Sequence, residues 1–160
     1  SHAGLAGFYL PHAQQFVDNN TEVDRRVPHC TSNELYKGVM YDYSKAVFNG
    51  KVFVRRDAQK TEAYQSNKNI MMSDHAVIDT KPELEIYADD VRCSHGSTTG
   101  QFDEEALFYL RARGLSAEGA KQLLVSAYVN EVIDRSQNET VVNYVKQALS
   151  QRGRIIADEI

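Results

Sequence analysis

A thiol and an imidazole lie two residues apart in the chain, at Cys93 and His95. If this segment is extended, both side chains project from one face, because strand side chains alternate between faces. The pair has the donor atoms of a nucleophile with its base, or of a metal or sulfur site. In a third interpretation Cys93 packs inward and His95 makes an ordinary hydrogen bond at a strand end. The residue types alone leave all three open.

Neither cysteine catalysis nor a closed metal site finds further support in the sequence. A cysteine hydrolase needs a nucleophile turn and a third orienting group, and neither is visible. A structural zinc site needs four ligands, and His29 and Cys30 are the ready candidates to join Cys93 and His95. The chain has no glycine-rich phosphate-binding motif, so we expect that it does not bind ATP through such a motif.

Short strands are predicted to position the pair. Runs rich in β-branched and aromatic residues, bounded by Asn, Asp, Gly or Ser, cover residues 14–17, 21–23, 34–39, 46–54, 63–67, 70–72, 76–79 and 84–87. Small polar residues, such as those at 19–21 and 66–67, recur between these runs and at their ends. That pattern favours a solenoid that turns at Asn, Ser and Asp, with roughly 20 to 25 residues per coil. A β-sandwich remains the alternative.

A helical pattern replaces the strands after residue 100. Asp103 and Ser116 are suited to be N-caps, and Gly114 is a stop signal between them. We predict helices up to Arg113, from Ser116 to about Arg135, and from near residue 138 to residues 152–153. The second helix carries an apolar stripe made of Ala120, Leu123, Leu124, Ala127, Tyr128, Val132 and Ile133. The chain therefore divides into a β region, residues 1–100, and a helical region, residues 101–160.

The composition of the 160 residues narrows the class of protein. With 42% hydrophobic and 25% charged residues the chain is ordinary for a globular protein. With a net charge of −4, the chain lacks the excess of basic residues that would neutralise phosphates, so we expect no nucleic-acid partner. The sequence has no run of about 18 apolar residues, which a membrane-spanning helix would need, and no recognisable signal peptide. We expect a cytoplasmic protein without a membrane partner and with reduced cysteines.

Several blocks in a single order resemble the C-terminal half of the SufD family, components of the SUF iron–sulfur cluster assembly machinery. The last β block contains Cys93-Ser94-His95, and the resemblance covers roughly residues 4–135. The matching blocks are residues 28–38, 48–52, 57–61, 79–86, 88–96 and 107–114.

The resemblance implies a fold and a function. The fold is a right-handed parallel β-helix followed by a small helical region. The implied function is that of a non-catalytic scaffold subunit, which pairs with a SufB-like subunit through the β-helix and docks a SufC-like ATPase through the helices. By position, His95 lies at the cluster-assembly interface and is the candidate metal ligand, with Cys93 in the same block. The docking region on the helices comprises Asp103, Leu107, Tyr109, Leu110, Leu123, Leu124 and Tyr128. We expect no cofactor in the isolated chain and a nascent iron–sulfur cluster only in the assembled complex.

Two other functions stay open beside the scaffold. A β-helix enzyme acting on a polysaccharide-like substrate would need an acidic or basic cleft along the solenoid. A purely structural interaction module would have Cys93 and His95 packed and silent. Because parallel solenoids leave open edges, a homodimer is also an expected partner state.

Overall fold

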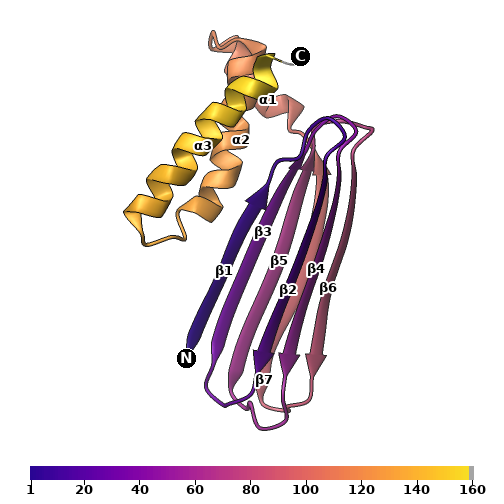
Figure 1. Cartoon of the computed structure of the whole chain (residues 1–160), viewed down its shortest axis with the longest axis vertical. Coiled ribbons are helices and arrows are strands. Elements are labelled where there is room, and N and C mark those ends of the chain that lie inside the picture. The colour runs from indigo at the N-terminus through magenta and orange to yellow at the C-terminus, as the bar shows by residue number, and fades with distance from the viewer. Residues whose placement is uncertain (159–160) are drawn as a thin grey trace. The chain divides into compact units, whose positions relative to one another are not determined.

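The computed structural model describes residues 1–158, with side chains as far as residue 151 (Figure 1). The chain forms two compact units, Ser1–Gln101 and Phe102–Ile160. The first unit is built of strands alone, and the described part of the second is helical.

Seven parallel strands make up the first unit, and they alternate along the chain between two sheets. One sheet has the order β1-β3-β5-β7 and the other β2-β4-β6, so each coil contributes one strand to each sheet (Figure 1). The strands are β1 (His2–Tyr9), β2 (Phe16–Arg25), β3 (Thr31–Met40), β4 (Lys45–Val54), β5 (Thr61–Met71), β6 (Val77–Ile86) and β7 (Val91–Gln101). This is a parallel β-helix of about three turns, as predicted, and the β-sandwich alternative is wrong.

The coils are longer than the sequence indicated. Paired residues are 29 positions apart between β1 and β3 (His2 with Thr31) and 32 apart between β4 and β6 (Lys45 with Val77). The predicted period of 20 to 25 residues is therefore wrong. The polar residues at 19–21 and 66–67 lie inside β2 and β5, not between strands, and β1 and the second half of β7 were missed.

Stacking of the coils pairs several of the polar side chains inside the strands. On the outer face, Asn49 donates to the Asn20 side chain one coil away, at 3.2 Å. In the interior, Tyr9 donates to Asn69 at 2.6 Å, Asn69 donates to Asn67 at 2.8 Å, and Asn67 donates back to the Tyr9 hydroxyl at 3.2 Å. Buried amides are stable when their hydrogen bonds are made, so Asn is a strand residue here and not a turn signal.

Tight packing surrounds this interior triad of Tyr9, Asn67 and Asn69. A Cβ atom at Gly38 would lie 2.3 Å from the Tyr9 ring and 2.4 Å from the Asn69 side-chain oxygen. Only glycine fits at this position, because the Tyr9 and Asn69 side chains lie so close to its backbone. Apolar clusters fill the rest of the interior, one around Val52, Val54 and Ala63 and one around Met40 and Ala46.

Local capping signals define the helical unit as predicted. The side chain of Asp103 accepts the Ala106 N–H at 2.9 Å and begins α1 (Glu104–Ala112). Gly114 follows α1 with a φ of +97°, and Ser116 caps α2 (Ala117–Ile133). α3 spans Glu139–Asp158, so it continues past the predicted end at residues 152–153.

The apolar stripe predicted on α2 is partly wrong. Its buried residues are Ala120, Val125, Val129, Val132 and Ile133. Leu123, which the prediction placed in the stripe, is 50% exposed. No helix in the described part of the chain is long and apolar enough to cross a membrane.

Candidate functional site

Cys93 and His95 both lie on β7, the last strand of its sheet. They pair in register with Ala63 and Gln65 of β5, and both of those side chains are buried in the coil. Because β7 is extended here, Cys93 and His95 share the face that continues the coil interior. Cys93 packs against the apolar cluster around Val52, whereas His95 is exposed. The interpretation in which both side chains are packed inside the fold therefore agrees with Cys93 and not with His95.

Burial makes Cys93 a poor nucleophile. It raises the pKa of the Cys93 thiol, and a hydrogen bond with the Ala63 backbone opposes that shift only in part. Since the thiolate is the reactive form, a raised pKa argues against an activated cysteine. A role as one ligand of a shared site remains compatible, because a bound metal itself drives deprotonation.

The four-ligand zinc site considered from the sequence does not form. Within the residues that the structure describes, no three His, Cys, Asp or Glu side chains come together as a metal site. His29 is exposed in the turn before β3, with a φ of +56°, and Cys30 is buried beside it. That interpretation is therefore wrong.

A row of side chains inside the coil leads to His95, and all of them except the first are polar. On the inward face of the sheet, Leu5, Glu34, Gln65 and His95 occupy equivalent register positions on β1, β3, β5 and β7. Gln65 donates to the Glu34 carboxylate at 2.8 Å, and the Thr21 hydroxyl donates to its other oxygen. Glu34 and Gln65 were not predicted as site residues from the sequence. Glu34 and Gln65 are 31 positions apart, and Gln65 and His95 are 30 apart. This repeat can be recognised in the sequence only when the coil length is known.

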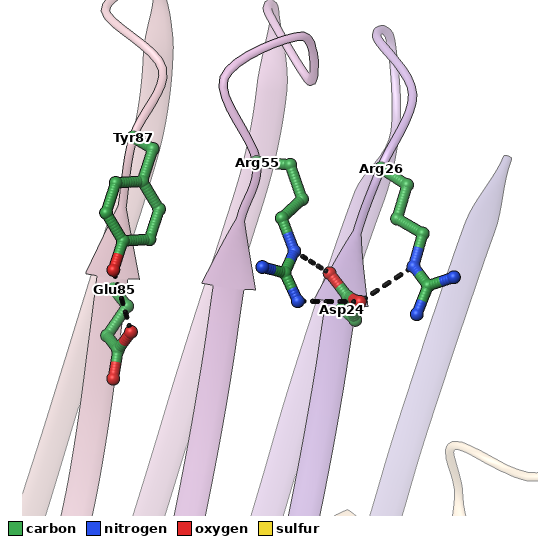
Figure 2. A network of polar contacts seen from close by, with 5 residues as sticks. All are labelled: Asp24, Arg26, Arg55, Glu85 and Tyr87. Carbon is green, nitrogen blue, oxygen red and sulfur yellow. Dashed lines mark hydrogen bonds and ion pairs between the residues drawn. The ribbon is translucent and has the colours of Figure 1, made fainter.

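The outer face of the β2-β4-β6 sheet carries charges in matched pairs (Figure 2). Asp24 accepts hydrogen bonds from Arg55 at 2.8 and 3.2 Å and from Arg26 at 2.7 Å, as Figure 2 shows. Hydrogen bonds from Arg55 and, to a smaller extent, from Arg26 lower the pKa of Asp24 to about 2. Beside them, Tyr87 donates to Glu85 at 3.1 Å (Figure 2).

Paired carboxylates of this kind do not form a glycosidase site. A hydrogen bond from Lys51 lowers the pKa of Glu85, and one from Lys81 lowers the pKa of Glu83. A general acid at neutral pH needs a raised pKa, and here the shifts run the other way. The polysaccharide-enzyme alternative therefore gains no support from this face.

The predicted docking residues lie in different environments on the helices. Leu107 is buried, and Leu110, Leu124 and Tyr128 are half-buried. Tyr109 is 57% exposed, with the Arg113 guanidinium 4.9 Å from its ring. An open groove of about 890 Å³ is lined by Asp103, Glu104, Glu105, Ala106, Phe108, Tyr109, Leu110, Ala112 and Leu124. Of the predicted set, the groove brings together Asp103, Tyr109, Leu110 and Leu124.

Comparisons with known proteins agree with this architecture. Residues 1–128 match the model of the SufBD core domain, described as SUF system FeS cluster assembly. The chain is 38% identical over 143 residues to the iron–sulfur cluster assembly protein SufD of Escherichia coli, covering 89% of this chain and 34% of that protein. It is 40% identical over 139 residues to an iron–sulfur cluster assembly SufBD family protein of Synechocystis, covering 87% of this chain and 31% of that protein.

A chloroplastic protein of Arabidopsis thaliana, ABCI7, is 35% identical over 138 residues, which are 86% of this chain and 29% of that protein. The chain thus spans about a third of the length of these relatives. The family match covers most of the chain, including all seven strands. The resemblance to SufD is therefore confirmed, and the chain belongs to the SufBD family of the SUF iron–sulfur cluster assembly system.

Proposed function

We propose that this chain is part of a non-catalytic scaffold subunit for iron–sulfur cluster assembly. The observation that carries the proposal is the exposed imidazole of His95 on the inward face of the last strand, beside the half-buried thiol of Cys93. Imidazole and thiolate are both iron ligands, and one exposed histidine leaves most of the coordination to a second protein. The nascent cluster is then cargo at a shared interface, and His95 leads Cys93 as its ligand.

The partner surface proposed for a SufB-like subunit is the end of the coil formed by β6 and β7. Each is the last strand in the order of its sheet, so its outer backbone groups have no strand beside them in the described structure. Such edges accept a further strand from another chain. A partner that adds strands there would cover His95. A second copy of this chain is the competing occupant, and it would appear as a homodimer.

The groove beside α1 is the proposed docking site for a SufC-like ATPase. It combines exposed aromatic side chains, Phe108 at 75% and Tyr109 at 57%, with the acidic residues Asp103, Glu104 and Glu105. Aromatic anchors with a charged rim are typical of protein interfaces. This proposal favours a partner that presents apolar side chains surrounded by basic ones. We also propose that the complex is cytoplasmic, as expected from the sequence.

The test is cluster formation in the full-length protein assembled with its SufB-like and SufC-like partners. We expect His95→Ala to reduce cluster formation strongly while the complex still assembles. Ser94→Ala is the matched control, because Ser94 lies next to His95 on the opposite, outward face of β7. Normal cluster formation in His95→Ala would contradict the proposed role. Separate pull-downs with each partner distinguish a heteromeric complex from a homodimer.

A further inference from the structure

Glu34 is an unusual group in the coil interior. Its side chain is buried, with 2% of the residue exposed, and its hydrogen bonds come from two neutral groups, the Thr21 hydroxyl and the Gln65 amide. Buried carboxylates normally have a cationic partner, since desolvation of an unpaired charge costs free energy. Packing alone therefore does not explain why the coil keeps a carboxyl group in its interior.

Glu34 determines which way the Gln65 side chain faces. Both Glu34 oxygens accept a hydrogen bond, so the Gln65 amide nitrogen, and not its carbonyl oxygen, faces Glu34. The 2.8 Å bond from Gln65 Nε2 to Glu34 Oε2 has this orientation. Gly50 leaves room for it, because a Cβ atom there would lie 2.3 Å from Gln65 Nε2. The Gln65 carbonyl oxygen is consequently directed away from Glu34.

That carbonyl oxygen has no hydrogen-bond partner. Gln65 is 3% exposed, and its Oε1 atom is buried without a donor in the described structure. An unsatisfied buried acceptor is costly, so a donor within reach would be stabilised by binding to it. The next residue in the same inward row is His95, whose backbone pairs with that of Gln65. Adjacent strands are about 4.8 Å apart, which is within reach of a Gln and a His side chain.

We propose that Gln65 positions His95 for cluster assembly. When a partner covers the end of the coil, Gln65 Oε1 accepts a hydrogen bond from one ring N–H of His95. The other ring nitrogen then keeps its lone pair and faces the incoming iron. Glu34, Gln65 and His95 thus form a carboxylate–amide–imidazole chain. In it, the Gln65 carbonyl oxygen orients the imidazole in the way that a carboxylate orients many metal-binding histidines. This inference rests on the proposed function of His95.

The direct test compares two substitutions on β5 that remove buried polar groups at nearly constant volume. Gln65→Met removes the acceptor. Thr61→Val is the matched control, because Thr61 is fully buried on the same strand face and its hydroxyl also has no hydrogen-bond partner. The His95 tautomer is measured by solid-state ¹⁵N NMR in the assembled complex, with the histidine rings of this subunit labelled. His95→Asn assigns the signal.

We expect Gln65→Met to change the ratio of the two neutral His95 tautomers by about two- to tenfold, the value of one ordinary hydrogen bond. Cluster formation should fall in the same variant, and Thr61→Val should change neither quantity. Glu34→Gln is a second, nearly isosteric variant. It frees the Gln65 amide to turn over, so it should shift the tautomer ratio in the same direction by a smaller amount.

The possible outcomes separate this inference from the proposed function. An unchanged tautomer ratio in Gln65→Met overturns the positioning role, even if cluster formation falls. If Gln65→Met does not assemble, an unchanged ratio in Glu34→Gln overturns it instead. If the ratio shifts but His95→Ala still forms clusters normally, the Gln65–His95 contact stands and the proposed function fails.

Discussion

Replacing Gly38 with Ala should strongly destabilise the β-helix. The added methyl group would lie 2.3 Å from the Tyr9 ring and 2.4 Å from Asn69 Oδ1, distances that carbon atoms do not tolerate. Both groups belong to the interior triad, in which Tyr9 donates to Asn69 at 2.6 Å. A shift of either group away from the methyl group would disturb that hydrogen bond inside the coil.

Two contributions set the size of the effect. Overpacking of a dense core costs about 1 to 3 kcal/mol. Separation of a buried hydrogen-bonded pair adds about 1 to 2 kcal/mol. We therefore expect the free energy of unfolding to fall by about 2 to 5 kcal/mol, a large part of the 5 to 15 kcal/mol typical of a native domain. Urea denaturation followed by circular dichroism measures this change directly.

Gly4→Ala is the matched control for this measurement. Gly4 lies on β1 in the same sheet, and no atom is within 4 Å of the position that its Cβ would occupy. This substitution should be neutral or stabilise slightly, because alanine restricts the unfolded chain. A Gly38→Ala variant as stable as Gly4→Ala would show that the interior triad does not pack tightly against Gly38.

Two further predictions concern the outer sheet face and the helices. The folded pKa of Asp24, about 2, lies below its ordinary value of 3.8, so its contribution to stability is present above pH 3.8 and is lost as pH falls through about 2. The stability difference between wild type and Asp24→Asn should therefore narrow over that interval in urea titrations at successive pH values, and a constant difference would contradict the assignment. Tyr109→Ala should weaken capture of the SufC-like ATPase by about fivefold or more, as expected for an aromatic anchor. Tyr144→Ala, which removes a 73% exposed tyrosine of α3 outside the groove, should not, and equal effects of the two would argue against docking at the groove.

The helices could be predicted from the sequence because their signals are local. Asp103 and Ser116 each cap a helix through a hydrogen bond to a backbone N–H three residues ahead. Such contacts depend on neighbouring residues only. The alternation of strand side chains likewise placed Cys93 and His95 on one face correctly.

The coil length could not be predicted, because the polar strand residues depend on distant partners. Asn67 and Asn69 have low strand propensity and resemble turn residues. Their hydrogen bonds to Tyr9 span 58 and 60 positions, so no local pattern reveals them. The same applies to Gln65, whose partner Glu34 is 31 positions away. The exposure of His95 follows from the place of β7 at the end of a sheet, which is a property of the stacked coils.

We propose above that His95 contributes a ligand to a cluster formed between subunits. The most direct measurement is the iron and acid-labile sulfide content of the full-length complex reconstituted with His95→Ala, beside the Ser94→Ala control. We expect a loss of about tenfold or more for His95→Ala, with the subunits still copurifying, and no loss for Ser94→Ala. Wild-type iron and sulfide in the His95→Ala complex would contradict it.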